Sequence, residues 1–381
     1  MEKKKNDFIA QGSILAIASI LVRVMGMIYR IPMTAIIGDK GNGFYSYAYS
    51  VYTILLLLSS YSLPLAVSKM VSAKAQLGQW RNVKRVFICA IAFAIGIGTT
   101  FGLIVLIGAQ FFTRVFFHSE LAAIALRFMA PTILIMALLG VFRGFFQGLQ
   151  NTLPTAVSQI VEGLINAIMS VVFAYFLFDF GHGMDAAGGT TDLGYAWGAA
   201  GGAIGTGAGA LAGLIFCFIL FVAYRKILAV NISRDKTGTQ QEYGDIFRLM
   251  LSIALPVILS TALYNLIELV DGSLFNNIMA SKGMEDVKDS MWGAYNAKAL
   301  LLVHIPVSIS SAMAVSLVPT LTAAYALGDE QTAKSKVHAI LRFISILAFP
   351  SAVGLLVLAN PIIKTLFSGD TSAASTYLQV V

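Results

Sequence analysis

Two arginines, Arg23 and Arg30, interrupt a stretch that otherwise has the composition of a membrane helix, "ILVRVMGMIYRIPM" (residues 20–33). Seven residues separate them, which is two helical turns, so both lie on one helix face about 10 Å apart along the axis. A guanidinium at the centre of a bilayer costs between about 2.5 and 17 kcal/mol, so such a pair normally faces a bundle interior or a wet cavity. Because a planar guanidinium donates two parallel hydrogen bonds to phosphate, the pair predicts a cationic site for an anionic headgroup.

Lys298 is the third basic candidate for this site. It lies about one turn into a later apolar segment and would add a positive charge from the other half of the chain. Two plainer interpretations stay open. Lys298 can extend its ammonium to the outer membrane interface, and the two arginines can pair with buried acids that hold the helices together.

Three acids, Glu162, Glu268 and Asp271, lie within or near apolar segments. Glu268 and Asp271 are three residues apart and share one face of a predicted helix. Buried carboxylates in transporters often bind protons or Na⁺, so the three are candidates for ion coupling. The alternative is that they balance the charge of the arginines.

Composition assigns the chain to the polytopic membrane proteins. Of its 381 residues, 57% are hydrophobic and 12% are charged, and the mean hydropathy is +0.80. Residues 86–113 contain no charged side chain, which is too long a run for a buried helix of a soluble protein. Nine spans and the start of a tenth are predicted, at 8–37, 44–77, 86–112, 122–150, 155–178, 195–224, 247–280, 294–325, 340–359 and from 373 onward.

Charge placement predicts the orientation and accounts for the net charge of +7. With the N-terminus in the cytoplasm, fifteen Lys and Arg residues fall on the cytoplasmic side and five fall on the outer side, a strong positive-inside bias. The basic balance therefore indicates membrane topology and no nucleic-acid partner. The first span lacks a convincing signal-peptidase cleavage site, so we predict an uncleaved first helix rather than a signal peptide.

The chain carries none of the motifs that would indicate an enzyme, a cofactor or a metal site. HExxH, GxSxG and the phosphate-binding loop are absent, and two cysteines in apolar spans define no disulfide framework. We therefore predict no catalytic residues. Gly201, Gly205, Gly209 and Gly213 recur every four residues, which predicts close packing against another membrane helix.

A weak internal repeat at an offset of 250 residues pairs 43–78 with 293–328, including Gly43 with Gly293. It maps the second span on the eighth and so predicts two parallel six-helix lobes around a central path. The predicted division is an N-terminal lobe at 1–228, a cytoplasmic linker at 229–246 and a C-terminal lobe at 247–381. Only spans seven to nine and the start of ten fall in that second lobe. The expectation is an all-α fold with an incomplete second lobe, from a longer protein.

Three segments resemble a known family: "LVRVMGMIYRIPMTAIIG" (21–38), "RGFFQGLQNTLPTAVSQIVEGL" (143–164) and "AYNAKALLLVHIPVSISSAMAVSLVPTLTAAYA" (294–326). They are similar to the polysaccharide-transport branch of the multidrug/oligosaccharidyl-lipid/polysaccharide (MOP) exporter superfamily, of the stage V sporulation protein B and lipid II flippase type. The resemblance implies that Arg23, Arg30 and Lys298 line a cationic cavity. The second arginine sits one residue later than in the Gram-negative pattern, and Lys298 replaces an arginine.

The resemblance implies a flippase of the cell membrane that moves an undecaprenyl-pyrophosphate-linked saccharide, lipid II or a related precursor, outward by alternating access. Its partners would be that lipid-linked saccharide, membrane lipid and proteins of cell-wall synthesis, with no cofactor. Two alternatives stay open. A cation-coupled multidrug exporter of the same superfamily would rely on Glu268 and Asp271, whereas a non-transporting scaffold for wall assembly would tolerate loss of the arginines.

Overall fold

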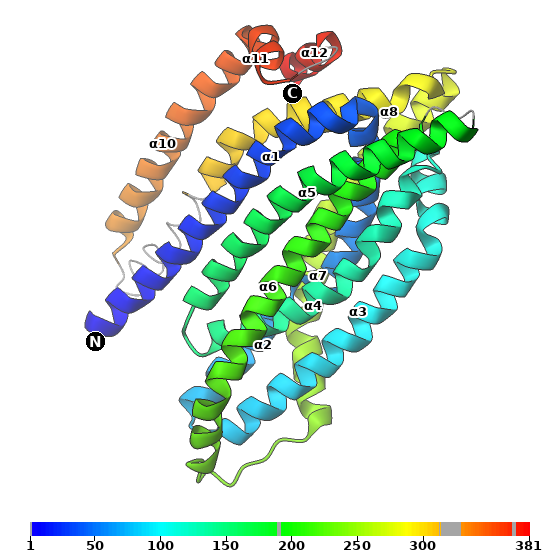
Figure 1. Ribbon diagram of the computed structural model, residues 1–381. Helices are drawn as coiled ribbons and strands as arrows, with labels where there is room; N and C mark the ends of the chain where they lie inside the picture. The colour runs from blue at the N-terminus through cyan, green and yellow to red at the C-terminus, as the bar shows by residue number, and fades with distance from the viewer. Residues whose placement is uncertain (1, 189–191, 312, 314–328, 368–370) are drawn as a thin grey trace.

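The computed structural model describes residues 2–188, 192–311, 313, 329–367 and 371–381, and all regular structure in these ranges is helical (Figure 1). Seven of the described helical segments are long and apolar enough to cross a membrane. Connections at 149–152 and 234–242 lie at one end of the bundle, and those at Gly38, 118–121 and 282–284 lie at the other (Figure 1). The chain thus crosses the bundle repeatedly, as the hydropathy pattern predicts.

The helices of the first part of the chain follow the predicted spans closely but are longer at several ends. Their bounds are α1 Glu2–Leu56, a π-helical turn Leu57–Tyr61, α2 Leu63–Gln76, α3 Trp80–Phe117, α4 Ala122–Gly148, α5 Leu153–Gly188 and α6 Leu193–Ser233.

The predicted spans 8–37 and 44–77 leave residues 38–43 between them, but a single residue turns the chain there. Gly38 adopts φ 63° and ψ −175°, and helical geometry resumes directly after it. Only glycine adopts this φ readily, since a Cβ would clash with the backbone. Asn42 stabilises the turn by donating from Nδ2 to the Gly38 carbonyl at 2.7 Å. α1 therefore consists of two limbs, before and after Gly38, that form the first crossing and most of the second (Figure 1).

The second crossing is broken where the sequence places a proline. The π-helical turn Leu57–Tyr61 precedes Pro64, which stands in the first turn of α2. Proline has no N–H to continue the helical hydrogen bonds, and an inserted π-turn is a common way to absorb such an interruption. The predicted span 44–77 is therefore two helices rather than one.

The glycine stripe of α6 packs against α5, as its spacing predicts. A Cβ added at Gly201 would meet the backbone of Phe173, and one added at Gly205 would meet Ser170. At Gly209 it would lie 2.6 Å from the carbonyl oxygen of Glu162. These contacts show that the two backbones touch directly, which requires residues without side chains.

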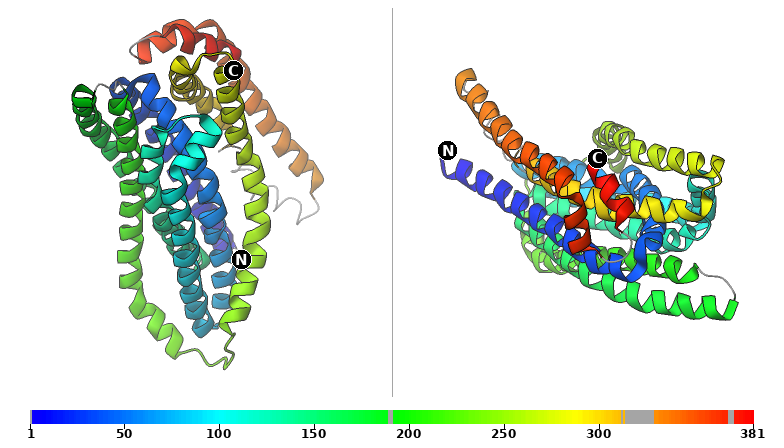
Figure 2. Two further views of the ribbon diagram at one scale, coloured as in Figure 1. Left: turned by 90° about the vertical axis from the view of Figure 1, so that its right-hand side faces the viewer. Right: turned by 90° about the horizontal axis from the view of Figure 1, so that it is seen from above.

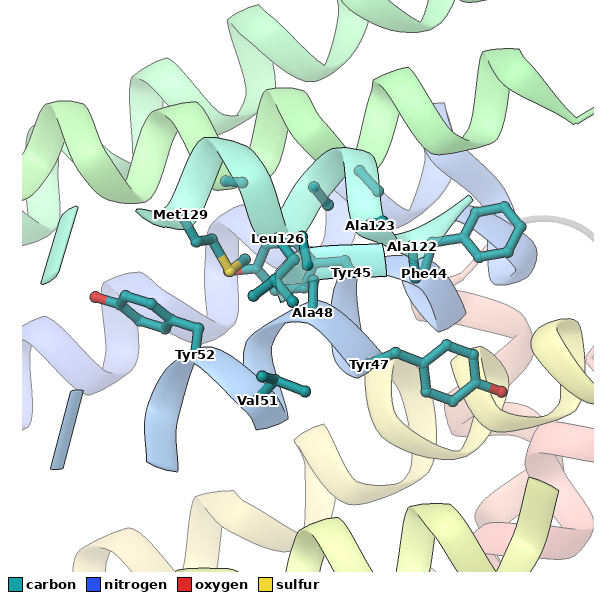
Figure 3. Close-up of a cluster of buried hydrophobic side chains, with 14 of the residues drawn as sticks. Phe44, Tyr45, Tyr47, Ala48, Val51, Tyr52, Ala122, Ala123, Leu126 and Met129 are labelled. Atoms are coloured by element: carbon teal, nitrogen blue, oxygen red, sulfur yellow. The ribbon is translucent and has the colours of Figure 1, made fainter. Parts of the chain in front are cut away.

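A buried cluster between the second limb of α1 and α4 holds the first six crossings together. Figure 3 shows Ala48 and Leu126 facing each other, with Met129 beside Leu126. Tyr47 points the other way, toward the second half of the chain, where its ring stacks on Phe117 with centroids 4.6 Å apart. The cluster fixes the second limb of α1, and that limb carries residues of the cavity described below.

The second half of the chain is less packed within the described residues. Its helices are α7 Tyr243–Ser281, α8 Glu285–Ala294, a π-helical turn Tyr295–Leu300 that continues as helix to residue 311, α10 Glu330–Val357, α11 Ala359–Leu366 and α12 Ser372–Val380. The helix that leads into the predicted eighth span, 294–325, begins earlier, at Glu285, and the part of that span at 312 and 314–325 lies outside the described residues. α10 begins ten residues before the predicted ninth span and makes its main contacts with α11 and α12, so that it projects from the bundle (Figure 2).

The polar segment between α6 and α7 is docked on the start of α3. Asp235 accepts hydrogen bonds from the Arg81 and Thr237 backbone N–H groups, each at 2.9 Å. Asn82 donates to the Thr239 carbonyl at 3.1 Å and accepts from the Gln241 N–H at 3.0 Å. The segment that joins the two predicted lobes is thus held by specific backbone contacts.

We expect Asp235→Ala to release this segment and to speed cleavage by trypsin after Lys236 severalfold. The hydrogen bonds lower the pKa of Asp235 to about 2, below the ordinary value of about 3.9. The carboxylate therefore stabilises the docked segment above about pH 4, and the effect is lost as pH falls toward 2. Hydrogen exchange at the Gln241 amide measures this loss. Asp245→Ala, in the exposed first turn of α7, is the control, and equal trypsin rates in the two variants would contradict the assignment.

Candidate functional site: a central charged cavity

A cavity of about 730 Å³ lies between helices of the two predicted lobes. One wall is formed by both limbs of α1 and by α5, which contributes Gly163 and Asn166. The other wall is formed by α7 and by the helical segment 292–308. Gly163 allows α1 to come close, since a Cβ there would lie 3.1 Å from Met25 Cε and 3.2 Å from Val22 Cγ1.

Arg23 and Arg30 both line this cavity from the first limb of α1. Their spacing of two turns places them on one face of α1, as the sequence predicts. Among the residues that the structure describes, neither arginine lies within ion-pair distance of a carboxylate. Tyr29, Tyr45 and Tyr49 line the cavity near Arg30. The guanidinium groups are therefore not committed to holding helices together within this part of the chain.

Glu268 and Asp271 line the same cavity from α7, and His304 and Asn296 line it from the segment after α8. Ser50 of α1 donates a hydrogen bond to Glu268 Oε1 at 3.3 Å. Positive charge thus comes from α1 and negative charge from α7, and both line one cavity. Because the charges are separated rather than paired, the cavity can bind a group of either sign or a zwitterionic molecule.

Glu162 lies elsewhere, in an ion pair with Arg143. The Arg143 Nη2 atom is 2.6 Å from Glu162 Oε2, and Arg143 Nε donates to Ser158 Oγ at 2.9 Å. The pair joins α4 to α5 and is mostly buried, with side chains 11% and 24% exposed. Glu162 therefore balances charge, as one alternative expects, but its partner is Arg143 and not Arg23 or Arg30.

Lys298 is buried beside the cavity and does not line it. Its ammonium lies 2.8 Å from the carboxylate of Asp39, and the lysine is 1% exposed. Asp39 directly follows the turn residue Gly38, so this pair ties the segment after α8 to the turn of α1. The structure thus brings Arg23, Arg30, Glu268 and Asp271 together and places Lys298 and Glu162 in structural ion pairs.

Aromatic and amide side chains complete the lining. Tyr45 and Tyr49 are stacked with ring centroids 5.8 Å apart, and Tyr45 shares a hydrogen bond with Thr206 Oγ1 at 3.4 Å. The spacing of four residues in "YSYAYSVY" places these rings on one helix face, which is the signal that could have revealed them. Such rings and amides commonly contact sugars and other polar ligands through stacking and hydrogen bonds.

The cavity is closed at the end of the bundle near Gly38. There the second limb of α1 crosses α8 so closely that a Cβ on Gly43 would meet the Asp289 carbonyl oxygen. A Cβ on Gly293 would meet the Asp39 carbonyl oxygen and lie 2.6 Å from the Gly43 N atom. These are the two glycines that the 250-residue repeat pairs, and each faces the backbone of the other's helix. Neither position accommodates a side chain while the crossing is closed.

The helices and the cavity define the class of the protein: a multi-pass, all-helical membrane protein with a charged central cavity between two groups of helices. In the described residues no group of three or more His, Cys, Asp or Glu side chains is placed to hold a metal ion. A model of the polysaccharide biosynthesis protein family matches residues 8–324, and a second model with the same description matches residues 286–374. The chain belongs to the polysaccharide biosynthesis protein family.

Two curated relatives come from Bacillus subtilis (strain 168). The lipid II flippase MurJ is 26% identical over 370 residues, which cover 94% of this chain and 65% of that protein. Stage V sporulation protein B is 24% identical over 382 residues, which cover 99% of this chain and 70% of that protein. The chain thus spans about two thirds of the length of each.

Solved structures show the same fold at low identity. An inward-facing multidrug resistance MATE family transporter of the MOP superfamily matches with a TM-score of 0.70 and 13% identity, over 95% of this chain and 79% of that one. A MOP superfamily transporter from Pyrococcus furiosus Vc1 matches with a TM-score of 0.63 and 14% identity, over 98% and 77%. The all-α, multi-pass membrane fold predicted from the sequence is therefore confirmed. The flippase and the transporters among these matches are not enzymes, which agrees with the prediction for this chain.

Proposed function

We propose that this protein is a flippase that moves an undecaprenyl-pyrophosphate-linked saccharide, lipid II or a related wall precursor, across the cell membrane by alternating access. The observation that carries the proposal is the position of Arg23 and Arg30 on one wall of the cavity without a carboxylate partner in the described part of the chain. Sequence similarity to a lipid II flippase supports a lipid-linked saccharide as the substrate.

The pyrophosphate fits the arginine wall for a chemical reason. Each guanidinium offers a planar pair of N–H donors, and hydrogen bonds to charged groups contribute about 1.5–3 kcal/mol each. The saccharide fits the tyrosine and asparagine side chains of the same cavity. A cavity of about 730 Å³ has the size of a small-ligand pocket, so the long polyprenyl chain stays in the bilayer.

The orientation that we propose follows the positive-inside bias, with the N-terminus in the cytoplasm and the closed Gly43–Gly293 end facing outward. We also propose the division into lobes at 1–228 and 247–381 with the linker at 229–246. The energy for outward movement comes from an ion gradient or from the membrane potential, which supplies about 2.3 kcal/mol per charge per 100 mV.

A second candidate function is cation-coupled export of drugs, and Glu268 and Asp271 in the cavity are the observation that favours it. Carboxylates in a membrane cavity bind cations and cationic drugs, and the structural relatives include multidrug transporters. Arg23 and Arg30, which line the same cavity, disfavour this candidate, because they repel a cationic substrate.

Complementation separates the candidates. The natural gene product should restore growth to a strain depleted of its lipid II flippase, and the purified protein should not move cationic dyes in liposomes. Glu268→Gln and Asp271→Asn should give a wall phenotype without drug sensitivity. Dye efflux with no complementation would instead establish the exporter, and complementation by an Arg23→Ala, Arg30→Ala double variant would favour a scaffold.

A further inference from the structure

Asp289 lies at the closed end of the cavity and has no role in the proposed substrate site. It lies on α8 at the crossing with α1 and is 8% exposed. Its carbonyl oxygen is the atom that a Cβ on Gly43 would meet. Among the atoms that the structure describes, none forms a hydrogen bond with Asp289 Oδ1, and none lies within ion-pair distance of this carboxylate. A buried carboxylate without compensation is costly, so this arrangement calls for an explanation.

The 250-residue repeat supplies a direct comparison, because Asp39 and Asp289 are 250 residues apart. The two acids occupy the two sides of one helix crossing. Asp39 is neutralised by the Lys298 ammonium at 2.8 Å. The residue of α1 that the offset pairs with Lys298 is Ala48, which carries no charge. The Tyr47 hydroxyl next to it acts on Asp289 but has no charge, and it donates a hydrogen bond to Asn276 Oδ1 at 3.0 Å. One acid of the pair therefore has a counter-charge and the other does not.

The lysines near Asp289 are committed to other groups. Lys288 donates to the Phe117 carbonyl at 3.2 Å and to the His118 carbonyl at 2.9 Å. Lys40 donates to both carboxylate oxygens of Asp192 at 2.8 Å. Both lysines lower the pKa of Asp289 from a distance, whereas the negative charge of Asp192 raises it.

Other charged groups lie on the helices that pack against α8. Together they add little net charge near the Asp289 carboxylate. Asp39 and Lys298 form a neutral pair, Glu268 and Asp271 of α7 face the cavity, and α12 contains no charged residue. Burial raises the pKa of Asp289 to about 6, against the lowering effects of Lys288, Lys40 and the Tyr47 hydroxyl. Desolvation of the charged form therefore dominates.

We propose that Asp289 is a proton-binding site that controls whether α8 and α1 stay in contact at this end of the cavity. The proton comes from the aqueous phase that this end faces, and it returns there when the crossing opens. The inference rests on the proposed function only in assigning transport to the cavity.

The direction of the effect follows from the two charge states. The protonated acid is neutral and tolerates the closed crossing, whereas the carboxylate gains hydration if the helices separate. When the crossing is open and the Asp289 carboxyl is hydrated, its pKa has the ordinary value of about 3.9. Protonation of Asp289 therefore stabilises the closed crossing fully below about pH 4. That stabilisation is lost as pH rises from about 4 to 6. The ratio of closed to open crossings should fall by as much as about 100-fold over this range, since each pKa unit corresponds to a factor of ten.

Cysteine accessibility tests this without requiring any substrate. In the natural gene product with Cys89 and Cys217 replaced by alanine, Ser46→Cys places a thiol in the cavity lining, and Ser281→Cys in a separate variant places one on the exposed end of α7. An impermeant thiol reagent is applied from the outer side between about pH 4 and 8. The labelling rate of the Ser46→Cys variant is divided by that of the Ser281→Cys variant, which removes the pH dependence of the thiol reaction itself. We expect this ratio to rise at least about tenfold with pH.

Asp289→Asn keeps the shape of the protonated acid and cannot ionise, so labelling at 46 should stay slow at every pH. Asp286→Asn, on the exposed face of α8, is the matched control and should keep the wild-type profile. A flat ratio in the parent protein would overturn the proposal even if the Asp289 variant failed to fold. An unchanged profile in Asp289→Asn would overturn it as well. Loss of complementation with an intact pH profile would refute the proposed function instead.

Discussion

Transport of lipid-linked saccharide should fall by about 10- to 100-fold in Arg23→Ala or Arg30→Ala and be undetectable in the double variant. Each substitution removes charge-assisted hydrogen bonds worth about 1.5–3 kcal/mol, and about 1.4 kcal/mol corresponds to a factor of ten. Arg→Lys at either position should recover only part of the activity, because lysine keeps the charge but loses the planar pair of donors. The measurement is complementation of a flippase-depleted strain together with the amount of folded protein in the membrane.

The amount of folded protein distinguishes a binding role from a structural one. Because neither arginine pairs with an acid in the described residues, both alanine variants should accumulate to near wild-type levels. Arg127→Ala is the matched control, since Arg127 is exposed on α4 and outside the cavity lining. A large drop in folded protein with Arg23→Ala would show instead that the residue holds the bundle together.

Gly205→Leu should lower the amount of folded protein by about tenfold or more. A Cβ at this position would meet the backbone and hydroxyl of Ser170, so α5 and α6 would have to separate. Overpacking of a well-packed core costs typically about 1–3 kcal/mol, and a clash with backbone leaves little room for the neighbours to relax. Size-exclusion chromatography of detergent-solubilised protein measures the monodisperse fraction.

Gly183→Leu provides the control for the same substitution on the partner helix. Nothing lies within 4 Å of a Cβ built on Gly183, so leucine there should leave the monodisperse fraction unchanged. If both leucine variants lost folded protein equally, the cause would lie in membrane insertion and not in the packing of α5 against α6.

The sequence by itself determined the crossings, the glycine contact face and the shared face of Arg23 and Arg30. Each of these depends on composition or on spacing within one helix, and helix geometry converts such spacing directly into position. Helix ends were less well determined. The turn at Gly38 needed one residue instead of a loop, because glycine at positive φ reverses the chain alone.

Only the tertiary structure decided which charges meet. Glu162 pairs with Arg143 of α4 rather than with the arginines of α1, and Lys298 pairs with Asp39, 259 residues away, rather than lining the cavity. The same holds for Asp289, which lies between the predicted spans 247–280 and 294–325 and which the fold buries at a helix crossing. Local patterns specify the face of a helix on which a side chain lies. The partner on that face depends on how separate helices pack, and that choice is made by burial and charge summed over the whole bundle.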